Sequence, residues 1–223
     1  MDAFSDPQVV ARYAEGPPRS VPGYYAMQSM TTILLAERAP EDARVLVLGA
    51  GGGLELKAFA QAQPGWSFDG VDPSLEMLQL AEQTLGPLAS RARLHQGYID
   101  HAPQGPFDAA CCLLTLHFMN IEERRHAAAE VRRRLRPGAP YVIAHLSFPQ
   151  GEGERALWLS RHANFLIASG LDADKAANAR VAIDTKTNIF APEQDEAILR
   201  EAGFSNISLF YAAFSFRGWV AYA

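Results

Sequence analysis

Five small residues in a row would let a ligand lie directly against the polypeptide backbone. They occupy positions 49–53, Gly-Ala-Gly-Gly-Gly, and follow Val45-Leu46-Val47-Leu48, an apolar run typical of a strand buried on both faces. Glycines permit a tight turn from strand to helix and bring a ligand close to the positive N-terminus of that helix. The pattern predicts a bound nucleotide or nucleoside, and a tight turn without a ligand is the alternative.

Asp72 follows the next apolar run, residues 68–71, and lies 23 residues after Gly49. A carboxylate at this edge of a nucleotide-binding sheet grips the ribose diol. As an alternative, Asp72 is only the N-cap of a helix that begins at Pro73. Leu54 stands where a dinucleotide enzyme needs glycine or alanine, and no Gly-Lys-Ser or Gly-Lys-Thr follows the glycines. A nucleoside ligand without a pyrophosphate remains, and S-adenosylmethionine fits.

Alternating strands and helices are predicted to position these residues. Strands separated mostly by helices indicate an α/β, doubly wound sheet, and two further β-rich runs near the C-terminus are predicted to pair antiparallel at one edge. The stretch 152–180 is helical in composition, and we expect it to be an insertion beside the site. The expected strands are 45–48, 68–71, 92–95, 107–114, 141–146, 207–211 and 214–221, and the clearest helices are 74–85, 121–136 and 192–202.

Charge and composition argue against several classes of function. Twenty Lys and Arg against 25 Asp and Glu leave a net charge of −5, which disfavours binding to nucleic acid phosphates and favours a small-molecule substrate. No apolar run approaches the roughly 18 residues of a membrane span, and the N-terminus lacks a secretory pattern, so we expect a cytoplasmic protein without a membrane partner. The two cysteines, Cys111 and Cys112, offer neither a disulfide framework nor a CxxC metal pair. We expect them to be buried packing residues. The oligomeric state stays open, with a homodimer as one outcome.

Four segments in order, 45–56, 68–74, 107–118 and 133–145, resemble the motif series of class I S-adenosylmethionine-dependent methyltransferases. With the closing hairpin, the resemblance covers residues 43–223. It implies a Rossmann-like seven-stranded sheet whose last strand is antiparallel, with helices on both faces and the cofactor across the carboxyl ends of the first four strands. Residues 1–42 would then be an N-terminal cap or lid segment with a helix, ahead of a cofactor-binding domain over 43–223.

The same resemblance assigns positions in this sequence to parts of the cofactor, whose product form is S-adenosylhomocysteine. It implies that Gly49, Ala50 and Gly51 face the methionine part, that Asp72 with Pro73 binds the ribose, that Tyr98 and Ile99 border the adenine, and that Leu113 and Thr115 flank the middle of the molecule.

Three shorter segments, 20–24, 114–118 and 202–204, resemble a narrower family, the carboxy-S-adenosylmethionine synthases. These enzymes share the methyltransferase fold, use prephenate and serve tRNA wobble-uridine modification. The resemblance implies that Tyr24 touches the cofactor, and it places Ile198 where that family has an arginine for the added carboxylate. An alkyl chain cannot grip a carboxylate, so we predict a methyltransferase. The synthase reaction and a non-catalytic cofactor-binding module stay as alternatives.

His117 follows the fourth predicted strand, where it could accept the proton released on methylation. A positioning role is the alternative, because transfer to a good nucleophile needs mainly alignment. We expect the segment before the first strand, including Tyr24, to cover the cofactor as a lid rather than join the core. The arginines between 124 and 136 alternate with glutamates, and we expect a solvated outer face rather than a surface for tRNA.

Overall fold

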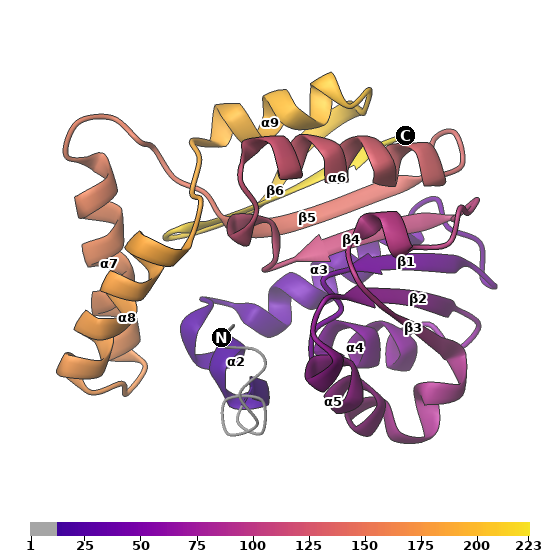
Figure 1. Ribbon diagram of the computed structural model, residues 1–223, viewed down its shortest axis with the longest axis horizontal. Helices are drawn as coiled ribbons and strands as arrows, with labels where there is room; N and C mark the ends of the chain where they lie inside the picture. Colours follow the sequence, from indigo (N-terminus) through magenta and orange to yellow (C-terminus); the bar gives the residue numbers. More distant parts are fainter. Residues whose placement is uncertain (1–12) are drawn as a thin grey trace.

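The computed structural model describes residues 13–223, and its centre is a seven-stranded sheet in the order β3-β2-β1-β4-β5-β7-β6 (Figure 1). Strands β1 to β5 run parallel, and β7 is antiparallel to its neighbours β5 and β6. This confirms the predicted doubly wound α/β sheet with its last strand antiparallel. The strands are β1 (Arg44–Leu48), β2 (Ser67–Asp72), β3 (Ala92–Gln96), β4 (Ala109–Leu113), β5 (Pro140–Leu146), β6 (Ser205–Ala213) and β7 (Phe216–Tyr222).

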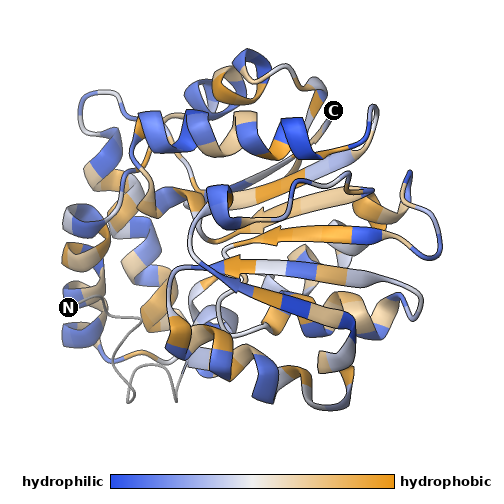
Figure 2. Cartoon of the chain, turned by 45° about the vertical axis from the view of Figure 1, so that its right-hand side comes forward, coloured by the Kyte–Doolittle hydropathy of each residue, from blue (hydrophilic) through white to orange (hydrophobic). Residues whose placement is uncertain are grey.

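Helices cover both faces of the sheet. Val45 and Val47 of β1 belong to the core cluster beneath α3 (Tyr24–Ala36) and α4 (Leu54–Ala62), while Leu46 and Leu48 belong to the cluster beneath α6 (Ile121–Arg134) and α9 (Pro192–Glu201). Burial on both faces explains why β1 is an unbroken apolar run. Figure 2 shows the hydrophobic colouring of the central strands and the largely hydrophilic helix above them. The remaining elements of the main body are η2 (Tyr13–Glu15), α2 (Gly16–Ser20), α5 (Leu75–Leu85), η3 (Gly86–Arg91), η4 (Ile99–His101) and η5 (Leu116–Phe118).

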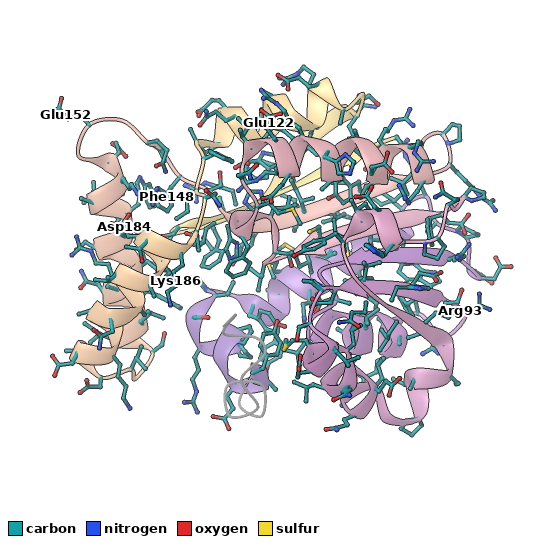
Figure 3. All side chains as sticks on the ribbon, in the orientation of Figure 1. Arg93, Glu122, Phe148, Glu152, Asp184 and Lys186 are labelled. Atoms are coloured by element: carbon teal, nitrogen blue, oxygen red, sulfur yellow. The ribbon has the colours of Figure 1, made fainter. Side chains whose placement is uncertain are left out.

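Two antiparallel helices, α7 (Glu154–Ala168) and α8 (Ala173–Lys186), extend beyond the carboxyl ends of the parallel strands (Figure 1). The sequence predicts one helical stretch here, but the chain turns back at Gly170, whose φ of 91° ends α7. Arg155 Nε bonds Asp184 Oδ1 at 2.7 Å and joins the two helices. The buried Phe148, labelled between the sheet and this pair in Figure 3, stacks on Trp158 of α7.

Part of the segment before β1 joins the core, so the expectation that this segment stays outside is wrong for Val21 and Tyr24. The first part of the expected cap or lid, residues 1–12, lies outside the described residues. Val21 and Tyr24 are buried members of the cluster under α3 and α4. The left-handed Gly23, at φ 68°, turns the chain so that Tyr24 points inward, where its hydroxyl accepts a hydrogen bond from Gln28 at 2.8 Å. The Tyr211 hydroxyl donates to the Pro22 carbonyl and ties the segment to β6.

Helix α6 is not a uniformly solvated face, and the expectation is wrong for two of its arginines. Arg124 and Arg134 are 2% and 1% exposed, whereas Arg125 and Arg133 are exposed. Arg124 is covered because α9 packs on α6 and brings Asp195, 71 residues away in sequence, against its guanidinium. Cys111 and Cys112 are buried and free, as expected, and no helix within 13–223 is long and apolar enough to span a membrane.

Candidate cofactor site

The glycine loop passes directly under the end of β4. Gly49 and Ala50 donate backbone hydrogen bonds of 2.8 and 3.0 Å to the Val71 carbonyl of β2. Gly49 has a φ of 75°, and a Cβ built on it would fall 2.0 Å from Thr115 Oγ1. An L side chain at position 49 would therefore be strained in its backbone and blocked by Thr115. The structure thus places Thr115, a predicted site residue, against the loop.

Asp72 connects the end of β2 to the same loop. Its Oδ2 accepts the Gly51 N–H at 2.9 Å, and its Oδ1 accepts the Ser74 N–H at 3.0 Å. The N-cap of α5 is Ser74, which accepts the Met77 N–H at 3.2 Å, so the alternative that Asp72 serves only as the N-cap is wrong. The Asp72 carboxylate thus connects the glycine loop to the turn after β2.

Two residues that the sequence did not single out border the loop. Tyr13 lies across it: a Cβ on Gly51 would sit 3.2 Å from the Tyr13 hydroxyl oxygen, and one on Gly52 would sit 2.8 Å from its ring. Glu55, in the first turn of α4, is 6% exposed. Burial, opposed by a hydrogen bond from its own backbone and aided by nearby Asp72, raises the pKa of Glu55 to about 8. Its position two residues after a glycine loop was the available signal.

The end of β4 is shielded from solvent, and its backbone is strained. Leu113 is buried, Leu114 has a φ of 56°, and the Thr115 hydroxyl donates to the Leu113 carbonyl at 3.1 Å. Positive φ at a non-glycine residue costs on the order of 1 kcal/mol and is found disproportionately at functional sites. Ala50 is fully buried, and its methyl packs onto Gly70 of β2. Leu113 and Ala50 therefore border the site mainly by shaping it.

The predicted adenine edge is split between buried and exposed residues. Ile99 is buried, whereas Tyr98 is 63% exposed and Pro73 is exposed. The Gly97 N–H bonds the Asp72 carbonyl at 3.0 Å, so the turn after β3 is held next to the ribose-binding candidate. The backbone geometry thus brings these residues together, while the Tyr98 ring is open to solvent.

His117 is buried behind the end of β4. Its Nδ1 accepts the Leu146 N–H at a long 3.5 Å, and its carbonyl accepts the Asn188 N–H at 2.7 Å. Burial, with nearby His145 and Arg124, lowers the pKa of His117 well below its ordinary value, so the ring is neutral at pH 7. Because Nδ1 is the acceptor, Nε2 carries the proton. This tautomer favours the positioning role over that of a general base.

Arg124 and Asp195 fix the chain that covers His117. Arg124 bonds the Asp195 carboxylate and the Asn188 carbonyl, and its guanidinium lies 4.4 Å from the Phe190 ring centre. Asn188 in turn donates its N–H to the His117 carbonyl and its side-chain amide to the Phe118 carbonyl. The buried pair thus holds the segment between α8 and α9 against the end of β4.

Comparison with a family model identifies the central part of the chain. Residues 45–138 match the model described as a methyltransferase domain, and the match spans the glycine loop, Asp72 and His117. This stretch is a methyltransferase domain. The fold and the relatives place it in the class I, S-adenosylmethionine-dependent group, as the ordered motifs predicted.

Similar proteins agree with both resemblances found in the sequence. The chain is 29% identical to the carboxy-S-adenosyl-L-methionine synthase of Chromohalobacter salexigens, over 97% of this chain and 82% of the relative. It is 26% identical to the synthase of the same name from Aeromonas hydrophila, over 99% and 90% of the two chains. The resemblance to this narrower family is therefore confirmed.

Among solved structures, human N-acetylserotonin methyltransferase in complex with SAM superposes with a TM-score of 0.68 at 14% identity. PigF with SAH gives 0.66 at 16% identity. Each match covers 98% of this chain but only 57% and 60% of those proteins, so the chain spans less than two thirds of their length. At these identities the likeness is one of fold.

Proposed function

We propose that this chain transfers a methyl group from S-adenosylmethionine to a small-molecule acceptor. The observation that carries the proposal is the bond between the Gly51 N–H and the Asp72 carboxylate, because it unites the glycine loop and the ribose-binding acid in one site. The cofactor supplies an electrophilic methyl group on a sulfonium. The proposed enzyme acts in the cytoplasm, either alone or as a homodimer. It has no nucleic acid partner, in keeping with its net charge of −5.

The residues of this chain act by binding and by alignment. Gly49, Ala50 and Gly51 expose backbone to the methionine part, and Asp72 accepts from the ribose. Tyr98 and Ile99 border the adenine. Tyr24, the first residue of α3, touches the cofactor. Thr115 and the buried His117 shape the end of β4, where the acceptor meets the methyl group. Alignment of this kind supplies most of the rate in a transfer to a good nucleophile.

The synthase reaction is the second candidate, and the names of the similar proteins favour it. The position that would need a cation is Ile198, which is buried beside Arg124 and Leu199 in a cavity of about 10 Å³. Arg124 already bonds Asp195, and Arg200 points outward. An added carboxylate would therefore lack a partner here, and a buried unpaired charge is costly.

Competition binding between the two cofactors tests this choice. We expect S-adenosylmethionine to bind at least as tightly as its carboxylated form, and we expect prephenate not to be consumed. A tenfold preference for the carboxylated form, about 1.4 kcal/mol, would favour the synthase. The unmodified protein is the right sample, because an arginine at position 198 would sit beside buried Arg124 and destabilise the fold. A non-catalytic module would bind either cofactor but transfer no methyl group to any acceptor tested.

A further inference from the structure

Glu55 is a buried acid at the candidate site. Within residues 13–223 its carboxylate forms no ion pair with Lys, Arg or His, although it is 6% exposed. It stands in the first turn of α4, immediately after the loop that Gly51 and Gly52 form. An isolated buried carboxylate is costly, and a protein avoids the cost by protonating the group or by supplying a positive partner.

The groups around Glu55 make that cost larger. Asp72 of β2 adds a negative charge. Tyr13 of η2, Tyr24 of α3 and Cys111 of β4 lie close enough that Glu55, after burial itself, raises the pKa of each of them. The side chains that interact electrostatically with Glu55 are thus neutral or negative and come from four different elements: Asp72, Tyr13, Tyr24, Cys111 and Cys112. These surroundings of Glu55 therefore favour the binding of a positively charged ligand group.

We propose that Glu55 is the counter-ion for the ammonium group of the bound cofactor and loses its proton when that group arrives. The inference rests on the proposed function, because it takes S-adenosylmethionine as the ligand. Its placement follows from the loop: the glycines that face the methionine part lead directly into the turn that carries Glu55. Tyr13 lies across the same glycines. The O–H bond of the neutral carboxyl breaks, the proton passes to the solvent buffer, and the carboxylate pairs with the ammonium.

Titration calorimetry at about pH 6.5 tests the proton release. S-adenosylhomocysteine carries a protonated α-amino group at this pH, since such groups have pKa values near 8. Glu55 is protonated in the free protein at the same pH, while His117 is neutral. Titrations in two buffers with different ionisation enthalpies should give close to one proton released per ligand bound. Binding without proton release would overturn the inference.

Substitutions distinguish a role of the Glu55 charge in ligand binding from a purely structural role of its side chain. Glu55→Gln should weaken S-adenosylhomocysteine binding at least tenfold and abolish the proton release. Glu76→Gln is the matched control, because Glu76 is likewise the second residue of a crossover helix after leucine, and it should change neither. Methylthioadenosine lacks the ammonium group, and it should bind Glu55→Gln and the unmodified protein equally. Equal weakening of both ligands would mean that Glu55 acts only structurally, and would overturn the inference. If the unmodified protein binds neither ligand, the proposed function fails first.

Discussion

The carboxylate of Asp72 holds the backbone N–H of Gly51 at 2.9 Å. This bond joins the end of β2 to the loop after β1, so the two predicted halves of the cofactor site form one unit. Because the same carboxylate also accepts the Ser74 N–H, Asp72 fixes the start of α5 as well. A change at Asp72 must therefore alter both the ribose contact and the shape of the loop.

Two variants should separate the effects on stability of the close contact at Gly49 and of its left-handed backbone. Gly49 and Gly153 have almost the same φ, 75° and 74°, but a Cβ on Gly153 would meet nothing within 4 Å. Gly153→Ala should cost about 1 kcal/mol of unfolding free energy, from the left-handed backbone alone. Gly49→Ala should cost at least about 2 kcal/mol more, because of the clash with Thr115. Urea unfolding measures both variants, and equal losses would contradict the close approach.

The Arg124–Asp195 pair should be the most costly ion pair of α6 to break. Removing one partner of a buried pair typically costs about 3–5 kcal/mol, because the other charge is left uncompensated. Arg124→Met should destabilise the protein by this order. Arg125→Met is the control, since its bonds to Glu122 and Glu201 are exposed and contribute little to stability. Similar denaturant midpoints for the two variants would show that the pair contributes little.

Glu55 should make the stability of the free protein fall as pH rises. Its pKa is about 8 in the folded protein against an ordinary value of 4.5. Below pH 4.5 the group is protonated in both states and costs nothing. Between about pH 4.5 and 8 the unfolded chain gives up the proton more readily, so stability declines by an amount on the order of several kcal/mol. Glu55→Gln should lack this decline, and the difference between the two pH profiles isolates it from the histidines.

The elements of the fold that could be predicted are those indicated by residues close together in the sequence. The run 45–48 alternates between two buried faces, and the glycines beside it carry the left-handed turns that they predict. The burial of Arg124 in α6 could not be predicted, because its partner, Asp195, is distant in sequence and only tertiary packing brings the two together. The inward turn of Tyr24 likewise depends on β6 contacting Pro22.

The candidate site could likewise be predicted only in part from the sequence, because some of its residues are brought together by tertiary packing. Motif positions placed Asp72 and Thr115 beside the loop, and the structure brings them there. The approach of Tyr13 to the glycines depends on the path of the chain before α3, which no motif encodes. Glu55 looked like an ordinary helix-starting acid, and only its burial distinguishes it from Glu76.

The segment Tyr13–Ser20 should respond to the cofactor, because Tyr13 lies on the glycine loop. Its backbone amides should exchange with solvent faster in the free protein than in the presence of S-adenosylhomocysteine. Amides of β1 serve as the internal reference, since that strand is buried in both states. Hydrogen exchange followed by mass spectrometry reports both regions, and unchanged rates in 13–20 would reject a covering role for the segment.

Calorimetric titration of S-adenosylhomocysteine into the unmodified protein and the Asp72→Ala protein tests directly whether the glycine loop and Asp72 bind the cofactor. We expect one ligand bound per chain, and an affinity about 1 to 3 kcal/mol weaker for Asp72→Ala, through lost charge-assisted hydrogen bonds to the ribose. Asp72→Asn, which can still accept the Gly51 N–H, controls for distortion of the loop. No binding to the unmodified protein, or equal affinity for Asp72→Ala, would contradict the assignment of the glycine loop and Asp72 as the cofactor site.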